Sequence, residues 1–196
     1  MWPRCQVTAV MAAAVAVAPF SIAPNIWPSH VLASDSVAKN SFVKAVLSAS
    51  KFEIDSSKLV LQKSASDDVK AFAEQMIADH TRAGEELWNV ISGHGGMFKA
   101  AYTEDEQSAV DLSSKDADAL ALLEGVDDAE FQSVDIALQD KANREAVHLV
   151  RSYASHPDDE ALGTFARKTL PVLEMHLDHI QKIAATQWVP PHGAYP

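Results

Sequence analysis

The chain of 196 residues contains a single cysteine, Cys5. This cysteine precedes the apolar segment of a predicted signal peptide, whereas a lipoprotein signal places its cysteine after that segment. A mature chain without a thiol has no disulfide framework, no thiolate nucleophile and no zinc or iron–sulfur site held by cysteine. Any metal site in the mature protein must therefore be built from histidine and carboxylate side chains.

Positive charge is also scarce, because 16 lysine and arginine residues stand against 27 aspartate and glutamate residues, a formal net charge of -11. Nucleic acids and anionic lipid surfaces are bound through clustered lysine and arginine, so the composition argues against both as partners. An acidic chain favours a small cation instead. The sequence identifies no protein partner.

The motifs of several enzyme classes are missing from the sequence. It has no glycine-rich phosphate loop, no Gly-x-Ser-x-Gly elbow, no His-Glu-x-x-His pair and no acidic calcium loop. Nothing in it specifies a hydrolase, and whether the protein is an enzyme stays open.

Long apolar runs are absent too. The longest apolar stretch of the sequence is too short for a convincing membrane span. Residues 1–33 are predicted to be a signal peptide, with the cationic start MWPR, the apolar stretch VTAVMAAAVAVAPF, and small residues at Val31 and Ala33 before Ser34. We expect a periplasmic or secreted protein after cleavage, with no span in the mature chain. Cleavage after Ala23 and an uncleaved anchor are the alternatives.

Strand patterns are nearly absent after residue 33, where apolar residues recur every three or four positions. The sequence predicts an all-α fold, a four-helix bundle over residues 34–186 with a flexible tail at residues 187–196. The long helices are expected at about 37–64, 66–93, 127–154 and 157–186, the last bent at Pro171. Two short helical pieces between Gly93 and Gly125, one starting at the capping box 103–106, predict a long crossover connection.

Helix starts are predicted from capping residues. Ser66 suits the N-cap of the second long helix, with acidic residues in its first turn. For the fourth long helix, Ser155 or His156 suits the cap and Pro157 the first helical position.

Three of the long helices place a polar residue in the middle of an apolar stripe, namely Glu53, His80 and His176. The stripes are Phe42, Val46, Ala49, Glu53 and Val60; Val69, Ala73, Met76, His80, Ala83, Leu87 and Val90; and Leu162, Ala166, Thr169, Leu173, His176, Ile180 and Ile183. The third long helix has an apolar side of Phe131, Val134, Leu138, Ala142 and Leu149. Because apolar stripes face one another in a bundle, we expect Glu53, His80 and His176 to converge in one interior layer.

A buried carboxylate and two imidazoles are costly unless they are hydrogen-bonded, ion-paired or bound to a metal. Ferritin-like di-metal sites use a Glu from each of two helices and a Glu-x-x-His pair from each of the other two. Neither His80 nor His176 has the Glu three residues before it, and Asp79 and Glu174 point elsewhere around their helices. The one such pair is Glu145 with His148. A metal site, a structural polar network and a pocket for another ligand all remain open.

The other histidines are expected to contribute less. His94, His156 and His192 fall in predicted loops or the tail and should be solvated. His179 follows His176 by one turn, so it either extends a site or lies on the surface.

The segments VKAFAEQMIADHTRAGEEL, EFQSVDIALQDKANREAVHL and LGTFARKTLPVLEMHLDHI closely resemble the family called domain of unknown function 4142. The resemblance covers about residues 37–185. It implies an exported bacterial protein with a ferritin-like helical bundle, a Glu in the first helix and histidines in the other three. Glu53, His80 after Asp79, and His176 after Leu-Pro match that pattern.

The third helix departs from the family pattern. Phe131 is followed by Gln132 where the family usually has Asp, and Asn143 occupies the position of the family's histidine. Because Asn is a poor transition-metal ligand beside imidazole, a metal site of the family type would here lose one ligand. His148 lies roughly 140° further around the helix and does not substitute.

The sequence thus predicts an exported, ferritin-like four-helix bundle of undefined biochemical role. The first hypothesis is that Glu53, His80 and His176 bind iron, manganese or zinc, all of which accept imidazole and carboxylate. The alternative is a metal-free structural or interaction module of the cell envelope, with these side chains in a buried polar network.

Overall fold

The computed structural model of the protein describes residues 38–63, 65–93 and 110–187. The predicted signal peptide, the capping box at residues 103–106, His94, His192 and nearly all of the predicted tail lie outside these residues. The described residues form five helices and no strand, which confirms the all-α class. The helices are α1 (Lys39–Gln62), α2 (Asp67–Ile91), α4 (Ser114–Gly125), α5 (Asp128–Ser155) and α6 (Glu160–Gln187).

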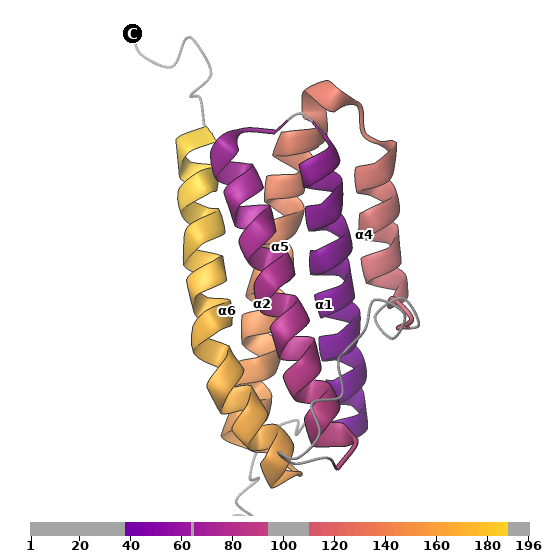
Figure 1. Ribbon diagram of the computed structural model, residues 1–196, viewed down its shortest axis with the longest axis vertical. Coiled ribbons are helices and arrows are strands. Elements are labelled where there is room, and N and C mark those ends of the chain that lie inside the picture. Colours follow the sequence, from indigo (N-terminus) through magenta and orange to yellow (C-terminus); the bar gives the residue numbers. More distant parts are fainter. Residues whose placement is uncertain (1–37, 64, 94–109, 188–196) are drawn as a thin grey trace, which may run out of the picture. The chain divides into compact units, whose positions relative to one another are not determined.

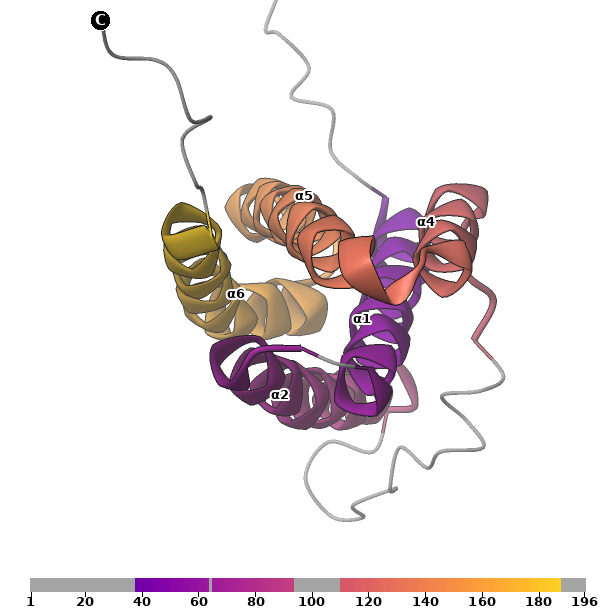
Figure 2. The same cartoon turned by 90° about the horizontal axis from the view of Figure 1, so that it is seen from above.

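The four long helices contact one another in the cyclic order α1, α2, α6, α5, and α4 lies outside this ring against α1 and α5 (Figures 1 and 2). Short connections make α1 and α2 antiparallel, and likewise α5 and α6. Phe42 near the start of α1 stacks on Tyr153 near the end of α5, with ring centroids 3.9 Å apart, so these two helices also run in opposite directions. α2 and α5 therefore run the same way.

The helix ends follow from local chemistry. Gly93, with φ of 69°, ends α2 where the sequence predicts a stop, because glycine adopts this left-handed conformation at little cost. Ser113 caps α4, and Asp127 caps α5 by accepting hydrogen bonds from two backbone N–H groups. Within the described residues, no helix is both long and apolar enough to cross a membrane.

Of the two predicted caps, that of α2 is confirmed and that of α6 is wrong. Ser66 stands at the N-cap position of α2, but its hydroxyl makes no capping hydrogen bond. α6 begins at Glu160, and its cap is Asp159, whose carboxylate accepts from the N–H groups of Ala161 and Leu162 at 3.1 Å. Pro157 thus lies in the connection, since an Asp two residues later provides the stronger cap.

The bend predicted for the helix that contains Pro171 is visible in α6 (Figures 1 and 2). Proline has no backbone N–H, and its ring clashes with the carbonyl one turn earlier, so the helix cannot continue straight through it.

The interior contains two separate apolar clusters. One gathers around the start of α1 and the end of α5, and it includes Phe42, Leu87, Tyr153 and Phe165. The other gathers around the end of α1 and the start of α2, and it includes Val60, Phe72, Met76, Phe131 and Ile180. Each large apolar side chain fully buried in such a cluster stabilises the fold by about 1.5–3 kcal/mol.

Candidate functional site

Between the two apolar clusters, every long helix directs polar side chains into the interior. All of these side chains belong to residues at most 6% exposed, and we call them the polar layer: Ser50, Glu53 and Ser56 from α1, His80 from α2, Asp135, Gln139 and Asn143 from α5, and His176 from α6. The three predicted ligands Glu53, His80 and His176 are thus buried, as the stripe pattern indicates. The layer consists of two groups with different chemistry.

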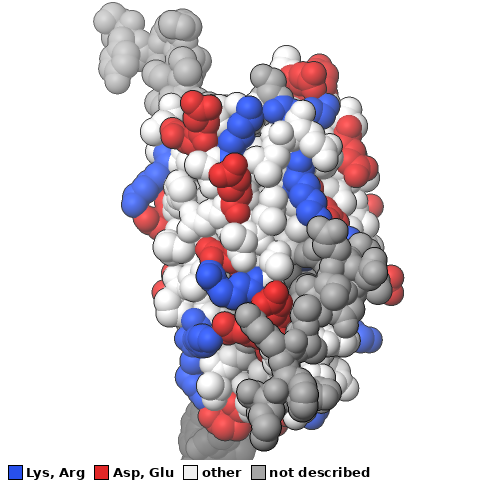
Figure 3. Space-filling model, in the orientation of Figure 1, with Lys and Arg blue, Asp and Glu red and all other residues white. Residues whose placement is uncertain are grey.

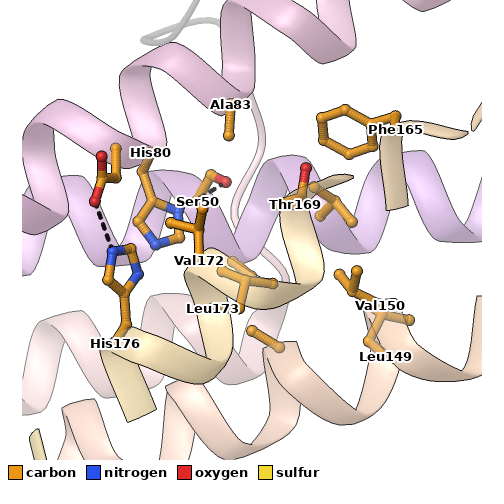
Figure 4. A pocket seen from close by; sticks show the side chains of 14 residues that line it. Ser50, His80, Ala83, Leu149, Val150, Phe165, Thr169, Val172, Leu173 and His176 are labelled. Atoms are coloured by element: carbon orange, nitrogen blue, oxygen red, sulfur yellow. Dashed lines mark hydrogen bonds and ion pairs between the residues drawn. The ribbon is translucent and has the colours of Figure 1, made fainter. Parts of the chain in front are cut away.

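The first group is a pair of imidazoles. The rings of His80 and His176 lie with their centroids 5.6 Å apart and their planes tilted by 32°. In Figure 4 the two labelled rings are neighbours, and the dashed hydrogen bonds leave them in different directions. α2 and α6, which place these histidines in mid-stripe, pack directly against each other.

Each imidazole uses one ring nitrogen and leaves the other without a partner. Nε2 of His176 lies 2.8 Å from Oδ2 of Asp79, and Nδ1 of His80 lies 3.1 Å from Oγ of Ser50. The opposite nitrogens, Nδ1 of His176 and Nε2 of His80, are buried and find no hydrogen-bond partner among the described residues. Because the Asp79 carboxylate only accepts, Nε2 of His176 carries the hydrogen and Nδ1 carries the lone pair.

Burial keeps both imidazoles neutral. It lowers the pKa of His80 to about 3, with a further lowering by His176 that Asp79 opposes. Burial also lowers the pKa of His176, although the hydrogen bond that its ring donates to Asp79 acts in the other direction. Neutral imidazole is the form that binds metals, so both rings are in the binding form at neutral pH.

A cavity of about 30 Å³ adjoins the imidazole pair. Its polar lining comes from Ser50, Asp79, Thr169 and the two histidines, and its remaining walls are apolar, among them Phe165 and Leu173 (Figure 4). Such a volume holds one or two water molecules or a single ion. It is far below the several hundred cubic ångströms that an organic substrate requires.

The second group, which we call the carboxyl–amide group, lies between α1 and α5. It contains Glu53 and Ser56 from α1, with Asp135, Gln139 and Asn143 from successive turns of α5. Nδ2 of Asn143 donates to Oε1 of Glu53 at 3.4 Å, and Nε2 of Gln139 donates to Oγ of Ser56 at 2.8 Å. The carboxyl group of Glu53 is thus hydrogen-bonded to α5 and not to α2 or α6, the helices that carry the histidines.

Both carboxyl groups hold their protons more tightly than usual. Burial, and after it the neighbouring Asp135 carboxylate, raise the pKa of Glu53 well above its ordinary value, although a hydrogen bond from Gln139 opposes this. Burial raises the pKa of Asp135 to about 7. Without a cation, this group therefore keeps protons that exposed carboxylates would have lost.

Of the three residues predicted to lie together, His80 and His176 are in contact. Glu53 lies in the same layer but contacts Asn143 of the carboxyl–amide group. In the described part of the chain, no group of three His, Cys, Asp or Glu side chains is placed to hold a metal ion. The Glu-x-x-His pair faces outward, because His148 is exposed and Glu145 forms an ion pair with Lys115. His179 is half-buried and packs on Phe72, 5.2 Å between ring centroids.

The apolar stripes do not reveal five residues of the site: Ser50, Ser56, Asp79, Asp135 and Gln139. Asp79 points away from His80 on its own helix, as predicted, but it reaches His176 on the neighbouring helix. Asp135 and Gln139 lie outside the predicted stripe, because hydrophobic periodicity turns the apolar side of the third long helix toward the interior. Val134, Leu138 and Ala142 are only half-buried, whereas Asp135, Gln139 and Asn143, each one residue later, are buried. Their i, i+4, i+8 spacing is the signal that identifies this polar face.

The family model described as "Domain of unknown function (DUF4142)" matches residues 29–183 of the chain. The comparisons with curated proteins and with solved structures give no match.

Proposed function

The chain belongs to the family described as domain of unknown function DUF4142, and from that premise we propose that its polar layer binds a transition-metal ion through His80 and His176. The observation that carries the proposal is the pair of buried ring nitrogens without hydrogen-bond partners, Nε2 of His80 and Nδ1 of His176. A buried, unpaired polar atom costs about 1–3 kcal/mol, and a metal ion removes that cost at both rings.

The partners of the two rings support this proposal. Metal-bound histidines almost always use their second nitrogen to contact a carboxylate, a carbonyl or water, which fixes the ring and its tautomer. Asp79 provides this contact for His176, and Ser50 provides it for His80. Iron, manganese and zinc are the candidate ions, since imidazole binds all three.

Glu53 remains the third predicted ligand. Its Oε2 is buried and without a partner among the described residues, as a ligand oxygen would be before binding. Its other oxygen contacts Asn143 on α5, so the proposal depends first on the two histidines.

We also propose that the fold is a ferritin-like four-helix bundle. The ring of four long antiparallel neighbours, with a returning connection that includes α4, is consistent with a ferritin-like four-helix bundle with a crossover. We likewise propose that residues 1–33 direct export and that residues 34–186 form the bundle in the periplasm or outside the cell, on the sequence pattern alone.

The second candidate function is a structural or interaction module of the cell envelope with a metal-free polar network. One observation favours it: the described residues contain no preformed group of three metal-binding side chains. Under this alternative, the carboxyl–amide group is a protonated network that fixes the register of α1 against α5.

Metal analysis separates the two candidates. The purified protein, produced with iron, manganese and zinc in the medium, is expected to contain stoichiometric metal that His80→Ala and His176→Ala remove. His148→Ala, an exposed histidine on α5, should leave the metal in place. Titration of the chelator-treated wild type with Co²⁺, followed by its visible spectrum, tests the site without any variant. A wild type that takes up neither metal nor Co²⁺ rules out the proposal and supports the metal-free network.

A further inference from the structure

The two buried histidines differ in what fixes their ring nitrogens. Nε2 of His176 lies 2.8 Å from Oδ2 of Asp79, and a carboxylate can only accept a hydrogen bond. Nδ1 of His80 lies 3.1 Å from the hydroxyl of Ser50, and a hydroxyl can either donate or accept. The contacts therefore dictate the tautomer of His176 and leave that of His80 open.

Asp79 is itself held by a second contact, on its own helix. Its other oxygen, Oδ1, accepts a hydrogen bond from the guanidinium group of Arg82, three residues later on α2. Each oxygen of the carboxylate thus has one partner among the described residues, Oδ1 on α2 and Oδ2 on α6. Side-chain exposure falls along these contacts, from 62% at Arg82 through 12% at Asp79 to 1% at His176. The guanidinium group therefore fixes the direction in which the Asp79 carboxylate faces.

We propose that Asp79 and Arg82 are positioning residues that preset His176 as a metal ligand through Nδ1. The hydrogen of the ring stays on Nε2, where the carboxylate accepts it. Nδ1 keeps its lone pair in the interior, where it is buried and has no hydrogen-bond partner among the described residues. Binding of the ion rests on the proposed function, whereas the tautomer of His176 does not.

An amide at position 79 would reverse this arrangement. Because Arg82 only donates, it would hold the amide oxygen of the Asp79→Asn variant and turn the amide nitrogen toward His176. That nitrogen then donates to Nε2, which moves the imidazole hydrogen to Nδ1 and removes the lone pair that would bind the ion. Without the guanidinium group, the amide can turn its oxygen to His176 instead. The effect of Asp79→Asn should therefore depend on Arg82.

Long-range ¹H–¹⁵N NMR spectra of the chelator-treated protein test the tautomer, since they distinguish protonated from unprotonated ring nitrogens. Wild type is expected to carry the His176 hydrogen on Nε2, and Asp79→Asn on Nδ1. The double variant Asp79→Asn/Arg82→Ala should return the hydrogen to Nε2 in a measurable fraction of the molecules. Asp178→Asn, which removes a carboxylate 65% exposed on α6, is the matched control and should give the wild-type tautomer.

Co²⁺ titration of the same variants tests the consequence for binding. Asp79→Asn should weaken Co²⁺ binding by about tenfold or more, the usual cost of losing the partner of a metal-bound histidine. The double variant should recover part of this loss, although it lacks one more contact. A merely structural role of Asp79 would not produce such a recovery, because a second lost contact would then weaken the protein further.

The outcomes separate control of the tautomer from metal binding. A wild type with the hydrogen on Nδ1 of His176 overturns the role of Asp79, even if no variant folds. The same tautomer in Asp79→Asn as in wild type, or in Asp79→Asn as in the double variant, overturns the role of Arg82. If the tautomer responds as expected but wild type binds no Co²⁺, the two residues do control the ring, and metal binding by the histidines is refuted.

Discussion

At the scale of single residues, Ser50 is the side chain that fixes the ring of His80. Its hydroxyl is the only partner that the described residues offer to Nδ1 of that ring, at 3.1 Å, and Ser50 is itself 6% exposed. The orientation of the buried imidazole, and therefore the direction of its free nitrogen, depends on one hydroxyl group.

We predict that Ser50→Ala lowers the free energy of unfolding by about 1–3 kcal/mol, because it leaves a buried ring nitrogen without a partner. Urea unfolding of the chelator-treated protein measures the change. Ser133→Ala is the matched control, since Ser133 is exposed and its hydroxyl donates to the helix carbonyl of Glu130; its effect should stay within about 0.5 kcal/mol. Equal effects of the two substitutions would show that Ser50 does not support His80.

Some residues of the site could be predicted from the sequence and others could not. Glu53, His80 and His176 were identifiable because a polar residue interrupts an apolar stripe. Asp79 was not, because its partner lies on another helix, and no spacing within α2 predicts a contact with α6. Helical periodicity gives the direction of a side chain on its own helix, but the distance to a neighbouring helix depends on the packing.

At the scale of helices, Gly163 lets α6 pack closely against the connection that precedes this helix. A Cβ atom added there would lie 2.7 and 2.8 Å from two ring atoms of Pro157, which is closer than real Cβ contacts. Gly125, the last residue of α4, has no such neighbour within 4 Å.

Gly163→Ala should therefore lower the free energy of unfolding by about 1–3 kcal/mol, since the crowding outweighs the better helix propensity of alanine. Gly125→Ala should be neutral or should stabilise by up to about 1 kcal/mol. Thermal or urea unfolding of both variants checks this opposite response. A stabilised Gly163→Ala would mean that the Pro157 ring moves away at no cost.

α4 is held to α1 by the Asp116 carboxylate, which accepts hydrogen bonds from the hydroxyls of Ser48 and Ser113 and lies 3.2 Å from the ammonium group of Lys115. Burial alone raises the pKa of Asp116, but these three donors together lower it below the ordinary value of 3.8. A lowered pKa in the folded state means that the ionised carboxylate stabilises the contact at all pH values above about 4. This stability is lost as the pH falls through the folded-state pKa.

We predict that α4 loses amide protection before the long helices do when the pH falls below about 4. Hydrogen exchange with mass spectrometry, expressed as protection factors, resolves residues 114–125 from α6. Asp116→Asn should reduce the protection of α4 already at neutral pH, while Asp118→Asn, exposed on the same helix, should not. Unchanged protection in Asp116→Asn would contradict this account.

The sequence was least informative about the helix that contributes most to the polar layer. Hydrophobic periodicity assumes that the buried face is the apolar one, and this holds for α2 and α6, whose stripes are largely buried. In α5 the assumption fails between Asp135 and Asn143. There the most buried positions are polar, whereas Val134 and Leu138 beside them are only half-buried, and Ile136 alone adds a buried apolar side chain to the core.

At the scale of the whole molecule, the chain has an excess of acidic residues, 27 against 16 lysine and arginine residues. Figure 3 shows acidic and basic side chains interspersed on one face of the described helices. Among the described residues, oppositely charged side chains form exposed ion pairs, such as Lys168 with Glu86 and Arg151 with Glu174. Exposed pairs of this kind contribute little to stability. On this face, the net charge of -11 therefore gives no single acidic patch for a cationic partner.

The directions of the helices have a mechanical consequence. The start of α1 belongs to the apolar cluster around Phe42, where the N–H of Lys39 also donates to Asp158 at 2.9 Å, and the end of α6 belongs to the opposite cluster around Ile183. A tensile force applied between these two points acts nearly parallel to the helix axes. The contacts between helices then carry the load in shear, all at once, so the helices must slide past one another before any of them can be pulled free.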